Sequence, residues 1–161
     1  MGNNLVLLMP RHLQETSIFE WRNSLNNCVL MTANDDINYV NYVKANLSSC
    51  CQYIEFFDNY HHSDLIEKRI TELNTFYRFK KIIVMAEVDI LRTARVRGEL
   101  KIEGQDLFSA VSFRDKHVMK TIAQKNNVLV PRFRKITNTF DLLDFIRIVD
   151  YPIIIKPLAA R

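Results

Sequence analysis

Four short apolar runs, separated by stretches of helical character, constrain the fold of this chain more than any other feature. The runs are Leu5–Met9, Cys28–Thr32, Gln52–Phe57 and Lys81–Met85. Short, largely apolar runs are typical of strands that are buried on both faces of a parallel sheet. Strand–helix units of about 25 residues therefore predict an α/β fold, with a Rossmann-like parallel sheet and right-handed crossovers.

Helical patterns fill the intervals between these runs. Residues 17–25 carry Ile18, Trp21 and Leu25 on one predicted face. Asn34-Asp35-Asp36 and Ser63 are suitable N-caps for two further helices, since their side chains can accept hydrogen bonds from the first helical N–H groups.

Glycine is scarce, and this limits what the sheet can bind by itself. The whole chain has only Gly2, Gly98 and Gly104. A dinucleotide fingerprint and a phosphate-binding P-loop both need closely spaced glycines after a strand. The sheet is therefore predicted to be a scaffold that lacks a classical nucleotide site of its own.

Composition limits the class of protein. The chain has 161 residues, 48% hydrophobic and 25% charged, with a net charge of +4 and a pI near 9.0. This predicts a soluble chain of one domain or slightly more, suited to a phosphate-bearing ligand. Basic residues mix with aromatic ones at residues 77–81 and 132–135. We interpret both as strand flanks, and we expect no nucleic-acid partner because a dedicated binder is more strongly basic.

Cysteine and histidine usage gives further limits. Cys28, Cys50 and Cys51 form no CxxC or zinc spacing, which favours a reduced, cytoplasmic location. His61-His62 and His117 lack a matching ligand set, so no metal site is expected there. The run Leu5–Met9 is too short for a signal peptide or a membrane span, and no membrane association is expected.

Charged residues gather after the fourth run. Ligands of open parallel sheets bind at the carboxyl ends of the strands, and Glu87 and Asp89 follow this one. Arg92 and Arg95 are three residues apart and are expected to share a helix face; Arg97 follows. Substrate binding by Glu87, Arg92 and Arg95 is one interpretation, and a solvated helix face is the other.

The stretch Gly98–Asp106 is predicted to be a linker. It separates a first domain, residues 1–105, from a second, residues 106–161. Ser112 is the expected cap of a helix that ends at Asn126-Asn127 and places Lys116 and Lys120 on one face.

An extended segment is expected over residues 128–136, and a helix capped by Thr139 over residues 140–149. Tyr151–Pro157 is a predicted strand that closes on Lys156. Such a lysine can extend to solvent, or it can meet an anionic ligand.

The order of these elements from Ser109 to Pro157 resembles the ATP-grasp superfamily of carboxylate–amine ligases. It resembles the junction between the pre-ATP-grasp domain and the start of the ATP-grasp domain. The resemblance implies that Lys116 and Lys156 bind the phosphates of ATP, with Lys156 at the α- and β-phosphates and a weaker claim for Lys120. It also implies activation of a carboxylate substrate as an acyl-phosphate, attack by an amine nucleophile, and Mg²⁺ held by late acidic residues.

The sequence departs from that family where a Gly-rich loop should follow Lys156, since Leu158-Ala159-Ala160-Arg161 stands there. We therefore expect an amino-terminal fragment of an amino-acid or peptide-type ligase that is inactive alone. The unpaired edge of its last strand is expected to fray or to pair with a second copy as a homodimer. The alternative is a non-catalytic α/β binding or regulatory module.

Overall fold

The computed structural model of the protein describes residues 4–11, 13, 20 and 24–158. The helix predicted around residues 17–25 lies largely outside them. The chain divides into two compact units, Met1–Leu107 and Phe108–Arg161, called here the first and second units.

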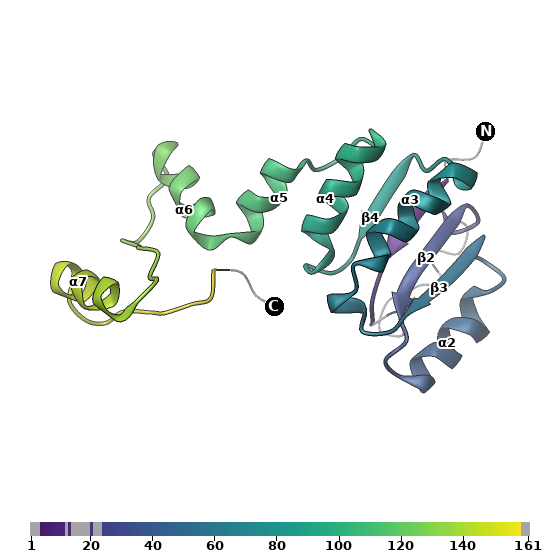
Figure 1. Ribbon diagram of the computed structural model, residues 1–161, viewed down its shortest axis with the longest axis horizontal. Coiled ribbons are helices and arrows are strands. Elements are labelled where there is room, and N and C mark those ends of the chain that lie inside the picture. Colours follow the sequence, from purple (N-terminus) through teal and green to yellow (C-terminus); the bar gives the residue numbers. More distant parts are fainter. Residues whose placement is uncertain (1–3, 12, 14–19, 21–23, 159–161) are drawn as a thin grey trace. The chain divides into compact units, whose positions relative to one another are not determined.

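The first unit is built on a parallel sheet. Its strands are β1 (Leu5–Leu8), β2 (Cys28–Ala33), β3 (Tyr53–Phe57) and β4 (Lys81–Val84). They lie in the order β3-β2-β1-β4, and all three neighbouring pairs are parallel (Figure 1). The predicted α/β fold with a parallel sheet is confirmed.

The helices of the first unit are α2 (Ile37–Leu47), the short 3-10 helix η3 (Tyr60–His62), α3 (Leu65–Tyr77) and α4 (Asp89–Leu100). Of these, α2 begins at the predicted cap Asp36, and α3 begins after Asp64, one residue beyond the predicted cap Ser63. The Asp36 side chain accepts a hydrogen bond from the Asn38 N–H, which caps α2. Ser63 Oγ accepts one from the Leu65 N–H at 3.3 Å, at the start of α3. Both contacts satisfy N–H groups that lack a partner inside the helix.

Two apolar cores lie on opposite faces of the sheet. Successive side chains of a strand point to opposite faces, so Val6 and Leu8 enter one core and Leu7 enters the other. Helices α3 and α4 cover the first core, to which Ile66 contributes. Helix α2 covers the second core, to which Val43 contributes. Burial on both faces explains why the central strands β1 and β2 are almost continuously apolar in the sequence, whereas the edge strands β3 and β4 are partly exposed.

The linker prediction is partly wrong, because α4 runs through Gly98 and ends at Leu100. Lys101 closes the helix in the left-handed conformation, and its N–H donates to Arg97 O. Gly104 follows with a φ of 144°. A Cβ placed there would lie 2.9 Å from Arg97 Nε. The loop therefore needs glycine both for its backbone conformation and for the space it leaves to Arg97.

Gly104→Ala is therefore expected to destabilise the first unit by about 1–3 kcal/mol, because Arg97 is buried and cannot move aside freely. The matched control is Gly98→Ala, since an added Cβ there meets nothing within 4 Å. That change is expected to stabilise α4 by about 0.5–1 kcal/mol. Urea denaturation followed by circular dichroism measures both, and equal effects would contradict the steric argument.

The regular elements described in the second unit are helices. Helix α5 (Leu107–Arg114) leads into it from the last residue of the first unit, and α6 (Lys116–Lys125) and α7 (Thr139–Val149) follow. The prediction that Ser112 caps a helix is wrong, since Ser112 lies inside α5 and its Oγ donates to Phe108 O at 2.7 Å. The cap of α6 is Asp115, whose extended backbone separates the two helices. For α7 the cap is Asn138, one residue before the predicted Thr139.

The strand predicted over residues 151–157 is not formed, and residues 128–136 form no ladder either. A strand needs a partner for its backbone groups, and no described segment of the second unit pairs with these residues. Their apolar side chains are consequently exposed, with Leu129 at 99% and Ile154 at 81%. Pairing of this segment with a second copy, as a homodimer, stays a prediction.

Among the described residues, no helix has both the length and the apolar character needed to cross a bilayer.

Candidate functional site

The strand order places a topological switch point between β1 and β4. The sheet grows from β1 toward β3, and the chain then crosses back to put β4 on the other side of β1. Ligands of open α/β sheets bind outside the carboxyl ends of the strands at such a point. Glu87 follows β4 there and is exposed, so the predicted residue stands at the expected edge of the sheet.

A buried polar cluster lies beside this edge. Tyr60 in η3 donates its hydroxyl to Asp89 Oδ2 at 3.1 Å, and Arg92 NH1 lies 3.5 Å from Asp89 Oδ1. Arg92 also donates to the backbone carbonyls of Tyr60 and His61, at 3.4 and 3.3 Å. Its Nε lies 3.8 Å from Glu67 Oε1 on α3. These contacts join η3, α3 and α4.

Burial shifts the acidity of the cluster. The Asp89 side chain has no solvent exposure, and desolvation raises its pKa to about 6 against the opposing effect of Arg92. Burial and the neighbouring Asp89 also raise the pKa of Tyr60 well above its ordinary value. A carboxyl with a pKa near 6 can hold or release a proton close to neutral pH.

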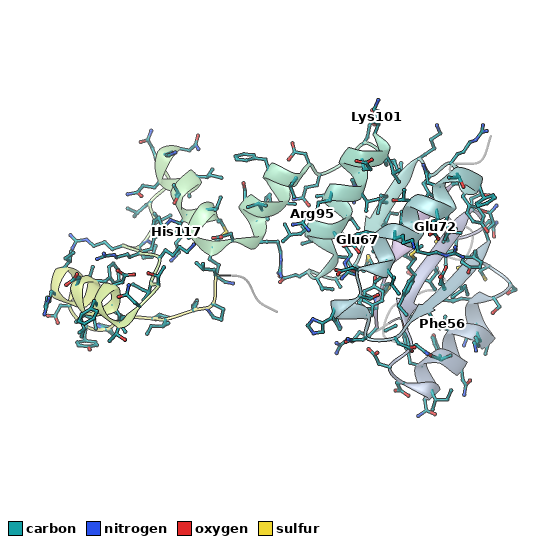
Figure 2. All side chains as sticks on the ribbon, viewed as in Figure 1. Phe56, Glu67, Glu72, Arg95, Lys101 and His117 are labelled. Carbon is teal, nitrogen blue, oxygen red and sulfur yellow. The ribbon has the colours of Figure 1, made fainter. Side chains whose placement is uncertain are left out.

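The two arginines of the predicted substrate site have different environments. Arg92 is 8% exposed and its guanidinium faces the internal partners of the cluster, whereas Arg95 is exposed. They therefore do not form the common face that their spacing predicts. Figure 2 labels Arg95 on α4 and Glu67 on α3. Substrate binding by Glu87, Arg92 and Arg95 stays a prediction.

The raised pKa of Asp89 predicts that the unfolding free energy of the first unit depends on pH. A carboxyl whose folded pKa lies above its unfolded value of about 3.8 adds stability at low pH. That contribution is lost as pH rises through about 6. Between pH 4.5 and pH 7.5 the loss is about 2 kcal/mol.

Asp89→Asn removes the titration and keeps an acceptor for Tyr60. The difference in unfolding free energy between wild type and this variant should therefore change by about 2 kcal/mol between those pH values, in favour of the variant at pH 7.5. Urea titrations at both pH values measure the difference. A difference that does not depend on pH would contradict the raised pKa.

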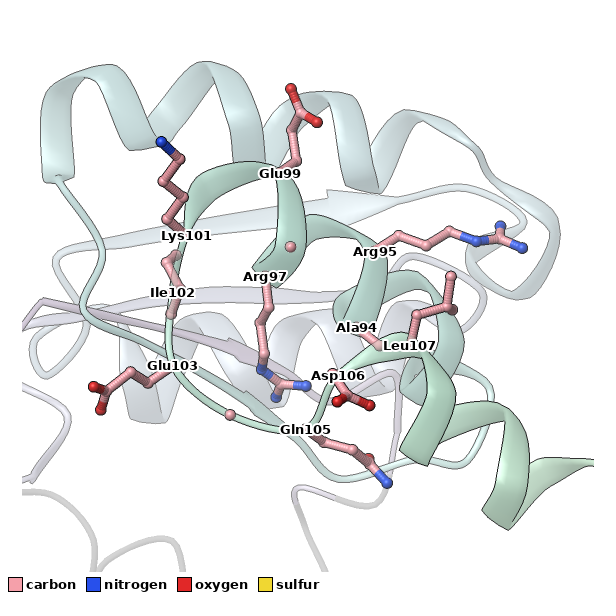
Figure 3. Close-up of a pocket in the computed structure, with 12 residues that line it drawn as sticks. Ala94, Arg95, Arg97, Glu99, Lys101, Ile102, Glu103, Gln105, Asp106 and Leu107 are labelled. Atoms are coloured by element: carbon pink, nitrogen blue, oxygen red, sulfur yellow. The ribbon is translucent and has the colours of Figure 1, made fainter.

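A hollow of about 580 Å³ lies at the other end of α4 (Figure 3). Arg97 extends from α4 toward the 103–106 loop at this hollow and donates to Ile82 O at 2.6 Å. Arg95, Lys101 and Glu103 are among the other residues that line it. The charged residues that line the hollow are of both signs.

Lys116 and Lys156, the predicted phosphate ligands, lie in the second unit. The Lys116 N–H donates to Leu158 O at 3.0 Å. This contact holds the segment that carries Lys156 against the first turn of α6. Lys116 is half-buried and Lys156 is exposed. The structure thus pairs Lys116 with Leu158, two residues after Lys156, although the strand predicted to carry Lys156 is absent.

The amino terminus of α6 already has partners for its backbone. Asp115 Oδ1 accepts from the N–H groups of His117 and Val118, at 2.8 and 3.0 Å, and Leu158 takes that of Lys116. A phosphate cannot reach these N–H groups without displacing a carboxylate or a carbonyl. Phosphate binding here would depend on the lysine ammonium groups themselves.

Lys120 has a local partner instead. Its Nζ lies 5.5 Å from the centre of the Phe133 ring, and the His117 ring packs edge-on against the same ring at 5.4 Å. This is the arrangement of a cation–π contact. A separate hollow of about 350 Å³ lies by Phe133, lined also by Arg134 and Phe145.

No three His, Cys, Asp or Glu side chains of the described residues gather as a metal site.

The sequence analysis did not predict the role of Tyr60 or the internal contacts of Arg92. A signal for Tyr60 was its place three residues beyond the end of β3, where side chains meet at the carboxyl edge. Nothing in the spacing of the arginines shows which one is buried.

Comparison with known proteins supports the fold. No family model matches the chain, and no curated protein matches it. Among solved structures, the crystal structure of an L-amino acid ligase from Bacillus licheniformis matches 98% of this chain with a TM-score of 0.72 and 16% sequence identity. The match spans 36% of the ligase chain. At this identity the likeness shows a shared fold.

Proposed function

We propose that this chain forms the first domain and the start of the nucleotide domain of an ATP-dependent carboxylate–amine ligase of the ATP-grasp superfamily. The observation that carries the proposal is the fold likeness to an L-amino acid ligase over 98% of the chain. The order of Lys116 and Lys156 in the sequence, and the contact that holds their segments together, agree with it. The remainder of the ligase, including its metal ligands, would come from polypeptide outside the matched region.

In the proposed reaction a substrate carboxylate oxygen attacks the γ-phosphorus of ATP, and ADP leaves. An amine then attacks the acyl carbon, forms the amide bond and releases phosphate. The two lysines would hold the phosphates and offset the charge that develops during transfer. Glu87 would face the substrate from the switch point of the sheet. Amino acids are the proposed substrate class because the structural neighbour is an amino acid ligase.

The test is release of phosphate from ATP that depends on both Mg²⁺ and an amino acid. The protein tested is this chain together with the polypeptide that supplies the rest of the ligase, and the chain alone is expected to show no turnover. Absence of ATP affinity in the extended protein would contradict the proposal and favour a non-catalytic binding or regulatory module.

A further inference from the structure

Three cysteines gather at one core of the first unit. Cys28 begins β2 and is fully buried, Cys50 is 6% exposed, and Cys51 is half-buried against the same core. All three are reduced. The proposed ligase chemistry uses none of them.

Cys28 and Cys51 lie on adjacent chain segments. The N–H of Gln52, the residue after Cys51, donates to Cys28 O at 2.8 Å. The β2–β3 ladder continues from there, with Val29 opposite Tyr53. Cys51 is thus one residue away from the position directly opposite Cys28. Strands about 4.8 Å apart with a rise of about 3.3 Å per residue then put the two Cα atoms about 6 Å apart, within the range of about 4.4–6.8 Å that a disulfide needs. The side chains of Cys28 and Cys51 also lie against the same apolar core.

The two thiols differ in their readiness to react. Interaction with the Cys28 thiol lowers the pKa of Cys51, because it stabilises the Cys51 thiolate. The same interaction, together with burial, raises the pKa of Cys28. Cys51 is also the more exposed of the two. Since the thiolate is the reactive form of cysteine, Cys51 is the sulfur that a small oxidant reaches first.

We propose that Cys51 and Cys28 form a peroxide-reactive thiol pair that closes an intramolecular disulfide. The Cys51 thiolate attacks one oxygen of hydrogen peroxide, the O–O bond breaks, and Cys51 becomes a sulfenic acid. The hydroxide that leaves takes up the proton that Cys51 released on ionisation and becomes the first water. The Cys28 sulfur then attacks the sulfenic sulfur, loses its proton, and releases a second water. Two thiols lose two electrons, and one peroxide is reduced to two waters. A dithiol reductant reverses the step by thiol–disulfide exchange.

Cys50 serves as the internal control, because it lies beside Cys51 in sequence but its Sγ lies 3.8 Å from Asn46 O in α2. The chain is treated with hydrogen peroxide, quenched and alkylated, and its intact mass and peptide map are measured. Cys50 and Cys51 are adjacent and fall in the same peptide, so the Cys50→Ala variant shows which of the two forms the disulfide. The mass of this variant should still fall by about 2 Da on oxidation. Its peptide map should contain a disulfide-linked Cys28–Cys51 peptide that a reductant reopens.

Cys51→Ser should abolish this disulfide. Cys28→Ala should instead accumulate a Cys51 sulfenic acid that dimedone traps, provided that circular dichroism shows the variant to be folded. A Cys50–Cys51 or intermolecular disulfide in wild type would overturn the proposal. Complete alkylation of Cys51 after peroxide treatment of wild type would also overturn it, and so would a Cys51→Ser variant that still forms an intramolecular disulfide.

Discussion

Arg92→Ala is expected to destabilise the first unit by about 3–5 kcal/mol at pH 7.5. The substitution leaves Asp89 buried without its cation, and removing one partner of a buried ion pair costs about this much. It also removes the donors to the carbonyls of Tyr60 and His61. Urea denaturation followed by far-ultraviolet circular dichroism measures the loss.

Two variants separate the electrostatic cause from simple truncation. Arg95→Ala shortens an exposed arginine on the same helix and should change stability by no more than about 0.5 kcal/mol. Adding Asp89→Asn to Arg92→Ala should restore part of the lost stability, because the uncompensated carboxylate is then absent. If the double variant is as unstable as Arg92→Ala alone, the buried charge is not the cause.

Lys156→Ala is expected to reduce ATP-dependent turnover of the extended protein about 100- to 1000-fold, the effect of removing one preorganised donor to developing charge. Lys156 is exposed, so its replacement should leave the fold intact. Phosphate release in the presence of amino acid measures the effect. Unchanged turnover would remove the central residue of the proposed function.

Lys116→Ala should act in the same direction, because the proposal gives it a phosphate as well. Lys120→Ala is the matched control. Lys120 lies on α6, as Lys116 does, but its ammonium group contacts the Phe133 ring. Its turnover should stay within a few-fold of wild type. Equal losses in the Lys120 and Lys156 variants would indicate a general loss of positive charge.

Prediction from the sequence worked where one element determines its own pattern. The apolar runs identify β1 and β2 because these central strands are buried on two faces, and Asp36 and Ser63 identify helix starts by local hydrogen bonds. It failed where a partner decides the outcome. Residues 151–157 have a strand composition, but a strand forms only when another segment accepts its backbone bonds. Ser112 is a suitable cap by residue type, but Asp115, three residues later, accepts hydrogen bonds from two N–H groups and is the cap in the structure.

The candidate site was predictable only in its location. Placing Glu87 at a sheet edge follows from strand order, which the alternation of elements suggests. The burial of Arg92 and the exposure of Arg95 depend on how α4 is rotated against α3 and η3. Spacing along one helix contains no information about that rotation, because packing of neighbouring elements sets it.

The position of β4 in the sheet has a consequence for the order in which the chain folds. Leu5 pairs with Lys81, across most of the first unit, whereas β1, β2 and β3 pair in sequence order. During synthesis β1, β2 and β3 can assemble before β4 emerges, and the edge of β1 that later pairs with β4 is then unpaired. Such an edge is apolar and can pair with another chain. The nascent protein is therefore most exposed to misassociation in the interval between the emergence of β3 and that of β4.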